Sequence, residues 1–299
     1  MCLSHSRMSL RIFVVSAAML AALILDVRVS SARQEQLTAD QAAARAKLDE
    51  GVQAYRKGKF DEATDDFKQA KEKDPSLLLA MLYLGTTYAS EYIPGAASQE
   101  NERHADLALD EFRDLLRKVP ATPSTSAETG LERTAIDAIA SILYNKAAMP
   151  FGTKTMGESK AYYEKHIHLW ANDPEPYYWI GVIDWSIAYH AEQQKRVDWT
   201  KRTGQTLAQD QMLPELARDE FGNEYGDTID EGIGRLKKAL ELRPDYDDAM
   251  AYLNLIYRLK ADTENSPQAR DEDIKTADEL VDKVKEIRQA RASSQQQKQ

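Results

Sequence analysis

The stretch from Ala44 to Leu77 decides the fold, and it reads ARAKLDEGVQAYRKGKFDEATDDFKQAKEKDPSL. Gly51 and Ala63 are small residues twelve positions apart, so each predicts a point where one helix approaches another closely. The turn between the two helices falls at Lys57-Gly58-Lys59. Asp74-Pro75 ends the second helix, because proline disfavours helical geometry at the residue before it. These 34 residues therefore predict one helical hairpin.

The hairpin resembles a tetratricopeptide repeat, and the match rests on Gly51, Tyr55, Gly58, Phe60, Ala63, Phe67, Ala70 and Pro75. A single hairpin cannot bury its apolar face, so further copies are expected. The resemblance implies an all-α fold, a right-handed α-solenoid of about five such hairpins with elongated turns inside the repeats. We place the repeats at about 44–77, 78–122, 131–174, 175–245 and 246–290. The segments 92–95, 179–185 and 242–257 are also similar to a group of uncharacterised exported bacterial proteins with this repeat.

Four of the five hairpins carry extra residues between their two close-approach positions. The largest excess forms a long insertion at 186–230, where residues 188–202 predict a prolonged helix that Gly204 ends. Leu213-Pro214-Glu215 predicts the start of another short helix, because proline and acidic residues suit a first turn. Insertions along one edge of a solenoid often form a binding edge. Hairpin tips are also where extra chain is tolerated, and the sequence leaves both interpretations open.

The N-terminal 32 residues have the pattern of a signal peptide. Arg7 and Arg11 precede the apolar run 12–25, and the small residues Ser30 and Ala32 suit cleavage after Ala32. Fourteen apolar residues are too few to span a bilayer as a helix. We therefore expect export to the periplasm or the exterior, with no stable membrane anchor after cleavage, although a retained signal peptide is an alternative.

Composition removes several function classes. Cys2 is the sole cysteine, so cleavage would leave a chain without disulfides, thiol nucleophiles or cysteine-ligated metals. The formal net charge of −10 disfavours nucleic acid as a partner. His166 and His168 lie about 200° apart around a helix, so they cannot share one metal ion. We find no catalytic, nucleotide-binding or metal-binding motif, and therefore expect a non-enzyme without cofactors.

Candidate binding residues come from the repeat resemblance. In that family the first helix of each repeat lines a concave groove, and tyrosine, tryptophan and arginine commonly anchor interfaces. The resemblance places these side chains on the groove: Tyr55, Arg56, Tyr144, Asn145, Tyr178, Trp185 and Arg258. Each aromatic residue also has the alternative of packing against neighbouring helices. The long insertion carries a basic group that is either a solvated face or an anion-binding rim: Lys195, Arg196, Lys201 and Arg202.

The sequence thus predicts a non-catalytic scaffold of the bacterial cell envelope that binds a protein or a peptide segment. One alternative is glycan binding through the tryptophans near the fourth repeat, and another is a helper in outer-membrane assembly. Residues 292–299 are polar and are expected to be disordered. The oligomeric state and the identity of the partner stay open.

Overall fold

The computed structural model describes residues 37–208 and 211–296, and in this part of the chain it contains ten α-helices. The predicted signal peptide and the last three residues lie outside the described residues. The chain divides into two compact units, with the boundary between Tyr162 and Tyr163. That boundary falls inside a helix, so the two units are described separately.

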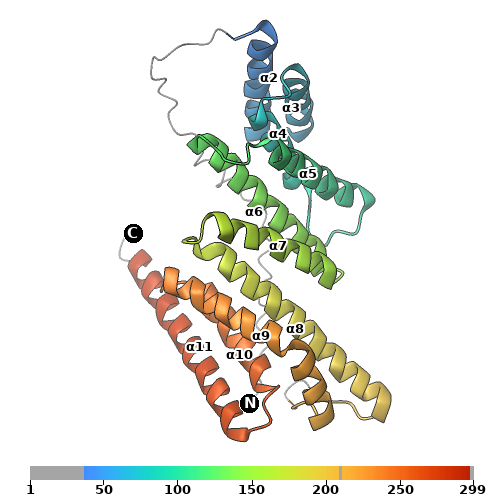
Figure 1. Cartoon of the computed structure of the whole chain (residues 1–299), viewed down its shortest axis with the longest axis vertical. Coiled ribbons are helices and arrows are strands. Elements are labelled where there is room, and N and C mark those ends of the chain that lie inside the picture. Colours follow the sequence, from blue (N-terminus) through green and yellow to red (C-terminus); the bar gives the residue numbers. More distant parts are fainter. Residues whose placement is uncertain (1–36, 209–210, 297–299) are drawn as a thin grey trace. The chain divides into compact units, whose positions relative to one another are not determined.

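Unit 1 contains two complete helical hairpins followed by a further long helix (Figure 1). Within it each second helix also packs against the first helix of the next hairpin. Phe67 and Phe112, both fully buried, fill the centre of the apolar core. Burying a side chain of this size contributes roughly 1.5–3 kcal/mol. The helices are α2 (Ala39–Arg56), α3 (Phe60–Lys73), α4 (Leu78–Glu91), α5 (Gln99–Lys118), α6 (Ser126–Ala148) and the first part of α7 (Thr153–Leu169).

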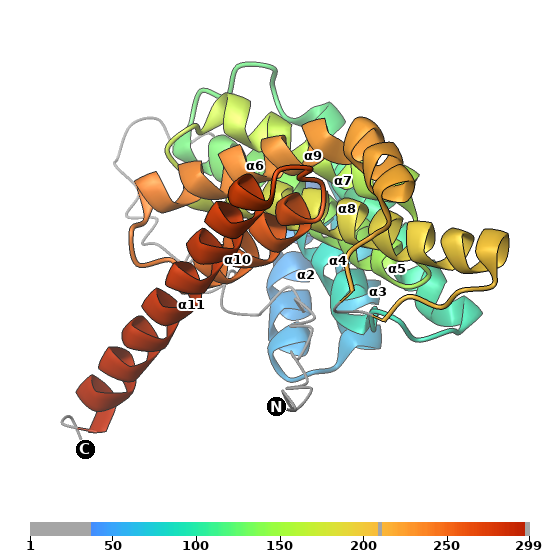
Figure 2. The same ribbon diagram turned by 90° about the horizontal axis from the view of Figure 1, so that it is seen from below.

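Unit 2 contains the end of α7 and two longer hairpins. Figure 1 shows the end of α8 and the start of α9 side by side, and these two segments form an arm. Figure 2 shows α11 crossing α10 and projecting beyond it. The core residues include Ile180, Leu236 and Ile256, all fully buried. The helices are α8 (Pro174–Thr203), α9 (Glu215–Leu242), α10 (Asp247–Ala261) and α11 (Pro267–Gln296).

Gly51, a predicted close-approach position, is confirmed as a helix crossing point, and Gly181 has the same role in unit 2. A methyl group built on Gly51 would lie 2.5 Å from Cε1 of Phe67. The same methyl group on Gly181 would lie 2.4 Å from Cγ of Leu236. Real Cβ atoms do not approach other atoms this closely, so only glycine fits where these helices cross. Both crossings join the two helices of one hairpin, as the tetratricopeptide-like spacing predicts.

The extra residues lie between the close-approach positions, and most of them lengthen the helices of the hairpin rather than its turn. α9 begins at Glu215, 17 residues before Gly232, whereas α3 begins at Phe60, only three residues before Ala63. The connection from 204 to 214 is the only part of the 186–230 insertion outside a helix among the described residues. No helix breaker occurs between 188 and 202, and Gly204, with φ of +75°, ends α8 as predicted.

Two predicted boundaries need correction. Leu213-Pro214-Glu215 opens a helix that continues to Leu242 rather than a short one, since the chain after it has no proline before Pro244. The predicted disorder of 292–299 is wrong for residues 292–296, which continue α11. None of the helices in the described ranges combines the length and apolar character needed to cross a membrane.

Candidate functional site

The predicted groove residues of unit 1 fall at the C-terminal end of α2. The Tyr55 hydroxyl lies 2.8 Å from Oγ of Ser90 on α4, and its ring contacts Phe60. Arg56 is exposed and has no ion-pair partner in the part of the chain that the structure describes. Burial raises the pKa of the Tyr83 hydroxyl, and the positive charge of Arg56 opposes that rise. Arg56 therefore lies near Tyr83, with its guanidinium available to a partner.

The other two predicted residues of unit 1 lie on α6. α6 contacts α4, so the first helices of successive hairpins form a continuous surface in this unit. Tyr144 is half-buried, whereas Asn145 is only 8% exposed. A side chain with so little exposed area serves packing and hydrogen bonding within the fold. We therefore retain Tyr144 as a candidate contact residue and remove Asn145.

In unit 2 the predicted aromatic residues divide into a buried and an exposed group. Tyr178 is buried among the rings of Tyr246 and Tyr252, with centroid separations of 5.0 and 5.8 Å. Trp185 is half-buried, stacks on Tyr189 at 5.2 Å and meets the edge of Tyr252 at 5.3 Å. Tyr178 thus belongs to the packing between α8 and α10, while the rings of Trp185, Tyr189 and Tyr252 are only half-buried.

Two residues of this aromatic group were missed at the sequence level, and one of them had a detectable signal. Tyr189 lies four residues after Trp185, which is the spacing of neighbours on one helix face. Tyr252 lies on α10, the first helix of the next hairpin, which contacts α8. A search for aromatic residues at helical spacing would have found Tyr189, whereas Tyr252 joins the group only through the contact between the two helices. We name the group formed by Trp185, Tyr189 and Tyr252 the aromatic patch.

Arg258 was predicted to contact a partner, but its guanidinium is already engaged within unit 2. Its Nη2 lies 2.6 Å from Oδ1 of Asp278 on α11, and its Nε donates to Oδ1 of Asn254 at 3.2 Å. The side chain is 40% exposed, so a partner could reach it only by competing with Asp278. Arg258 therefore ties α11 to α10.

The basic residues of the arm do not form an anion-binding rim, because each of them has an acidic neighbour. Lys195 lies 2.9 Å from Glu224, Lys201 lies 3.5 Å from Asp198, and Arg202 lies 3.3 Å from Glu220. The partners of Lys195 and Arg202 come from α9, far along the sequence, so the helix pattern of α8 alone could not reveal them. The pairs of Lys195 and Arg202 join the two helices of the arm, whereas the Lys201 pair lies within α8.

Arg196, the fourth basic residue, is buried and acts as a clasp inside the arm. Its Nε donates to Glu192, which is 2% exposed. Its Nη1 donates to the carbonyl oxygens of Ala208 at 2.9 Å and Gln211 at 2.6 Å. Burial raises the pKa of Glu192 in spite of the neighbouring guanidinium. Burial also raises the pKa of Asp262, and the positive charge of Arg196 opposes that rise. We call Arg196 and Glu192 the charged clasp.

The side chain of Asn101, which we call the neutral clasp, holds the turn between α4 and α5. Oδ1 of Asn101 accepts from the backbone N–H of Ile93 at 2.6 Å, and its Nδ2 donates to the carbonyls of Ile93 and Ala96 at 2.9 and 3.0 Å. Ser98 caps α5, accepting from the backbone N–H of Asn101. Asn101 is only 6% exposed, so its hydrogen bonds are shielded from water and hold the turn in one conformation.

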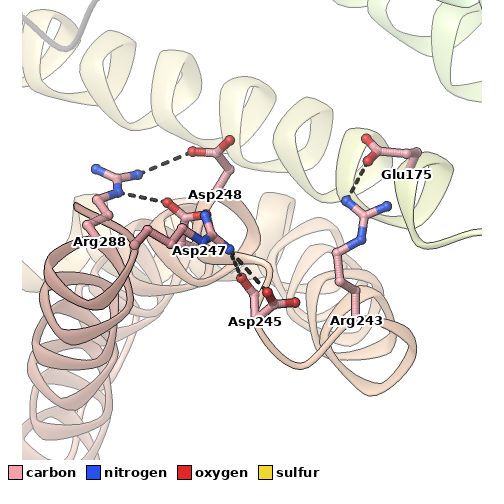
Figure 3. Close-up of polar contacts among 7 residues, drawn as sticks. Glu175, Arg243, Asp245, Asp247, Asp248 and Arg288 are labelled. Carbon is pink, nitrogen blue, oxygen red and sulfur yellow. Dashed lines mark hydrogen bonds and ion pairs between the residues drawn. The ribbon is translucent and has the colours of Figure 1, made fainter. Parts of the chain in front are cut away.

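A cluster of ion pairs fixes the start of α10 (Figure 3). Oδ2 of Asp247 accepts from Nε of Arg288 at 2.8 Å, and Oδ1 accepts from Nη1 of Arg291 at 2.6 Å. Burial alone would raise the pKa of Asp247, but these two arginines hold it below its usual value. At the other side Arg243 lies 2.7 Å from Glu175 of α8. These contacts bind α11 and α8 to the α10 terminus, so the carboxylates have a structural role.

Metal chemistry finds no support in the side chains of residues 37–208 and 211–296. No three His, Cys, Asp or Glu side chains in these ranges are grouped so that they could hold an ion. His166 is buried with Nε2 3.3 Å from Oδ2 of Asp173, whereas His168 is exposed. The two imidazoles therefore have different surroundings, as their spacing predicted.

Comparison with known proteins identifies the fold. No protein-family model and no curated protein matches the sequence. A crystal structure of MamA is 16% identical, covers 84% of this chain and 94% of its own, and has a TM-score of 0.51. The chain has the fold of tetratricopeptide-repeat proteins. Two other similar structures are MamA from residue 41 to its end, from Desulfovibrio magneticus RS-1 (15% identity, 83% and 96% coverage, TM-score 0.46), and YrrB, a TPR protein with an unusual peptide-binding site (15%, 84% and 92%, 0.46).

Proposed function

We propose that this protein is a non-catalytic scaffold that binds a protein or peptide through the surfaces of its first helices. The observation that carries the proposal is that one arginine and three aromatic rings on first helices remain accessible to a partner. Arg56 is exposed without an ion-pair partner among the described residues, and the aromatic patch of unit 2 is only half-buried. Arginine and large aromatic side chains dominate the binding energy of interfaces, because they offer broad contact area and planar donors. The peptide-binding site described for YrrB is in keeping with this use of the fold.

Site-specific crosslinking tests the proposal. A photoreactive amino acid is placed at Arg56 or Trp185, and matched controls carry it at Gln69 of α3 or Lys283 of α11, which lie on second helices. We expect specific capture of the same proteins from the first pair and not from the controls. Arg56→Ala should reduce capture while changing the free energy of unfolding by less than about 0.5 kcal/mol, because its charge is unpaired. Capture only from the control positions would overturn the assignment.

Glycan binding is a second candidate, and the aromatic patch favours it. Sugar rings pack on accessible aromatic rings, and Trp185, Tyr189 and Tyr252 bring three half-buried rings close together. The four tryptophans do not act as one group, since Trp170 packs against His166 and Trp179 against Tyr163. A change in tryptophan fluorescence on adding oligosaccharides, lost in Trp185→Phe and not caused by glycan-free envelope extract, would replace the scaffold proposal.

We further propose that the scaffold is exported to the cell envelope. The support is the basic and apolar pattern of residues 1–32, which lie outside the described residues. N-terminal sequencing of the protein from fractionated cells should find Arg33 first, in the periplasmic or extracellular fraction. An intact N-terminus in the cytoplasmic fraction would contradict the proposal.

A further inference from the structure

Unit 1 exposes two large apolar side chains at the tips of neighbouring hairpins. Ile93, in the turn after α4, is 64% exposed, and Met149, at the end of α6, is 59% exposed. A methyl group built on Gly95 would lie 3.0 Å from Cε of Met149, so the two turns are in contact. Ile93 and Met149, which we name the tip patch, are therefore exposed apolar side chains on two turns that touch each other.

The tip patch is held rigidly, which distinguishes it from an apolar residue on a mobile loop. Asn101 bonds both the N–H and the carbonyl oxygen of Ile93. Lys146 of α6 lies 2.6 Å from Glu102 and 2.9 Å from Asp106, both on α5. These contacts fix the two turns relative to each other. A partner that covers the patch would pay little ordering entropy on this side of the interface.

The charges around the tip patch are acidic and incompletely balanced. Glu91, two residues before Ile93, has no ion-pair partner among the described residues, and neither has Glu100 at the start of α5. Burial raises the pKa of Glu91, and the nearby carboxylates of Asp61 and Glu100 raise it further, while His104 opposes them. Glu91 is also the last residue of α4, where the helix dipole disfavours an anion. This placement of Glu91 lowers the stability of the protein without a partner.

We infer that the tip patch docks a positively charged segment of a partner protein, in which an apolar side chain lies between lysines or arginines. The apolar side chain would cover Ile93 and Met149, and the flanking cations would neutralise Glu91 and Glu100. The acidic surroundings decide the occupant, because they repel anionic lipid surfaces and acidic peptides and attract basic ones. This inference rests on the proposed scaffold function and gives its partner a chemical class.

A set of synthetic peptides tests the inference by fluorescence anisotropy on the full chain. The probe carries two leucines among four lysines. One companion replaces the leucines by serines, and the other replaces the lysines by glutamates. We expect binding of the probe alone. The double variant Ile93→Ser/Met149→Ser should weaken it about tenfold or more, the effect of losing one or two buried apolar side chains. Binding of all three peptides alike, or of none, would overturn the inference.

Glu91→Gln gives a signature that a purely structural residue would not produce. It should weaken probe binding several-fold and reduce its dependence on salt, while raising the melting temperature, because an unfavourable charge is removed. Asp65→Asn on α3 and Val197→Ser on α8 are the matched controls, both exposed, and should change neither quantity. Weaker binding together with a lower melting temperature would instead make Glu91 a structural residue and remove the charged half of the inference.

The two proposals fail in different ways. If the probe does not bind while crosslinkers at Arg56 and Trp185 still capture partners, the scaffold stands and the tip inference falls. If sedimentation shows a dimer that Ile93→Ser/Met149→Ser dissociates, the occupant is a second copy and the inference is also wrong. Loss of both probe binding and capture would remove both proposals.

Discussion

The hairpins α4/α5 and α8/α9 both hold their connecting chain in place, but they use different side chains to do so. Both extend beyond their crossing points, and both fix the connecting chain with one buried polar side chain. Asn101 satisfies three backbone groups with a neutral amide. Arg196 satisfies two carbonyls with a guanidinium, and its charge then requires Glu192 beside it. A buried charge must be compensated, so the longer connection depends on a pair of residues where the shorter one depends on one.

Removing the charged clasp should have the largest effect. Arg196→Met leaves Glu192 buried without its counter-charge, and we expect a loss of about 3–5 kcal/mol in the free energy of unfolding of the arm. The double variant Glu192→Met/Arg196→Met should regain most of it. Arg202→Met, at an exposed pair, should cost less than about 1 kcal/mol. Denaturant unfolding with proteolysis near Ala208 measures these changes. A double variant as unstable as the single one would show that the charge itself is not decisive.

The neutral clasp should cost less to remove. Asn101→Ala leaves the N–H and carbonyl of Ile93 and the carbonyl of Ala96 without their partner, and we expect a loss of about 1–3 kcal/mol. Gln99→Ala, an exposed neighbour in the first turn of α5, should change stability by less than about 0.5 kcal/mol. If Asn101→Ala costs as much as Arg196→Met in the same assay, the distinction between the two clasps is lost.

The crossing glycines of the same two hairpins sharpen the comparison. A methyl group on Gly181 would lie 2.4 Å from Cγ of Leu236, and one on Gly85 would lie 2.9 Å from Cε1 of Phe112. Gly→Ala at each position should destabilise the protein by about 1–3 kcal/mol. The loss should be larger at Gly181, because the branched Cγ of Leu236 can move aside less than the ring edge of Phe112. Gly234→Ala, with nothing within 4 Å, should instead stabilise α9 by about 0.5–1 kcal/mol. Thermal unfolding distinguishes these outcomes.

Lowering the pH should have a smaller effect on stability than these substitutions, and this effect distinguishes the charged clasp from the neutral one. The pKa of Glu192 is raised in the folded protein, so its contribution to stability is complete below the unfolded pKa and is lost as pH rises through the folded pKa. Asp262, which Arg196 and Arg270 face, acts in the same direction. Lowering the pH from 7.5 toward 5 should therefore slow hydrogen exchange around 204–208, after correction for intrinsic rates. Glu192→Gln should remove most of this dependence around 204–208 and should leave any dependence of the α4–α5 turn, which Glu91 adjoins, unchanged.

The sequence predicted the parts of these hairpins that depend on local chemistry. Gly51 marked a crossing of the first hairpin because only a missing Cβ allows that approach, and Gly204 ended α8. The spacing between crossings could not reveal whether the intervening residues are turn or helix. The 186–230 segment is an insertion by its spacing, and most of it continues the two helices of the arm, on the α9 side as well as over the predicted 188–202.

The candidate site was predicted less well, because it depends on contacts across long sequence separations. Arginine is seldom buried, so nothing in the sequence distinguished Arg196 from the exposed Arg202. Arg258 looked available because its partner Asp278 lies in the next helix. Arg56 and Trp185 were placed on the first helices by the repeat resemblance alone. Ile93 and Met149 carried a signal that was not used, since each is a large apolar residue in a turn.

The hydroxyl of Tyr246 gives unit 2 an optical reporter. It is 2.7 Å from Oε2 of Glu175, to which it donates, and burial together with that carboxylate raises its pKa. The chain has 14 tyrosines, and in an alkaline titration followed by ultraviolet absorbance those at the surface would ionise first. Tyr246 would ionise only when α8 and the start of α10 separate. The final step of the absorbance curve would then record the opening of this unit without any label.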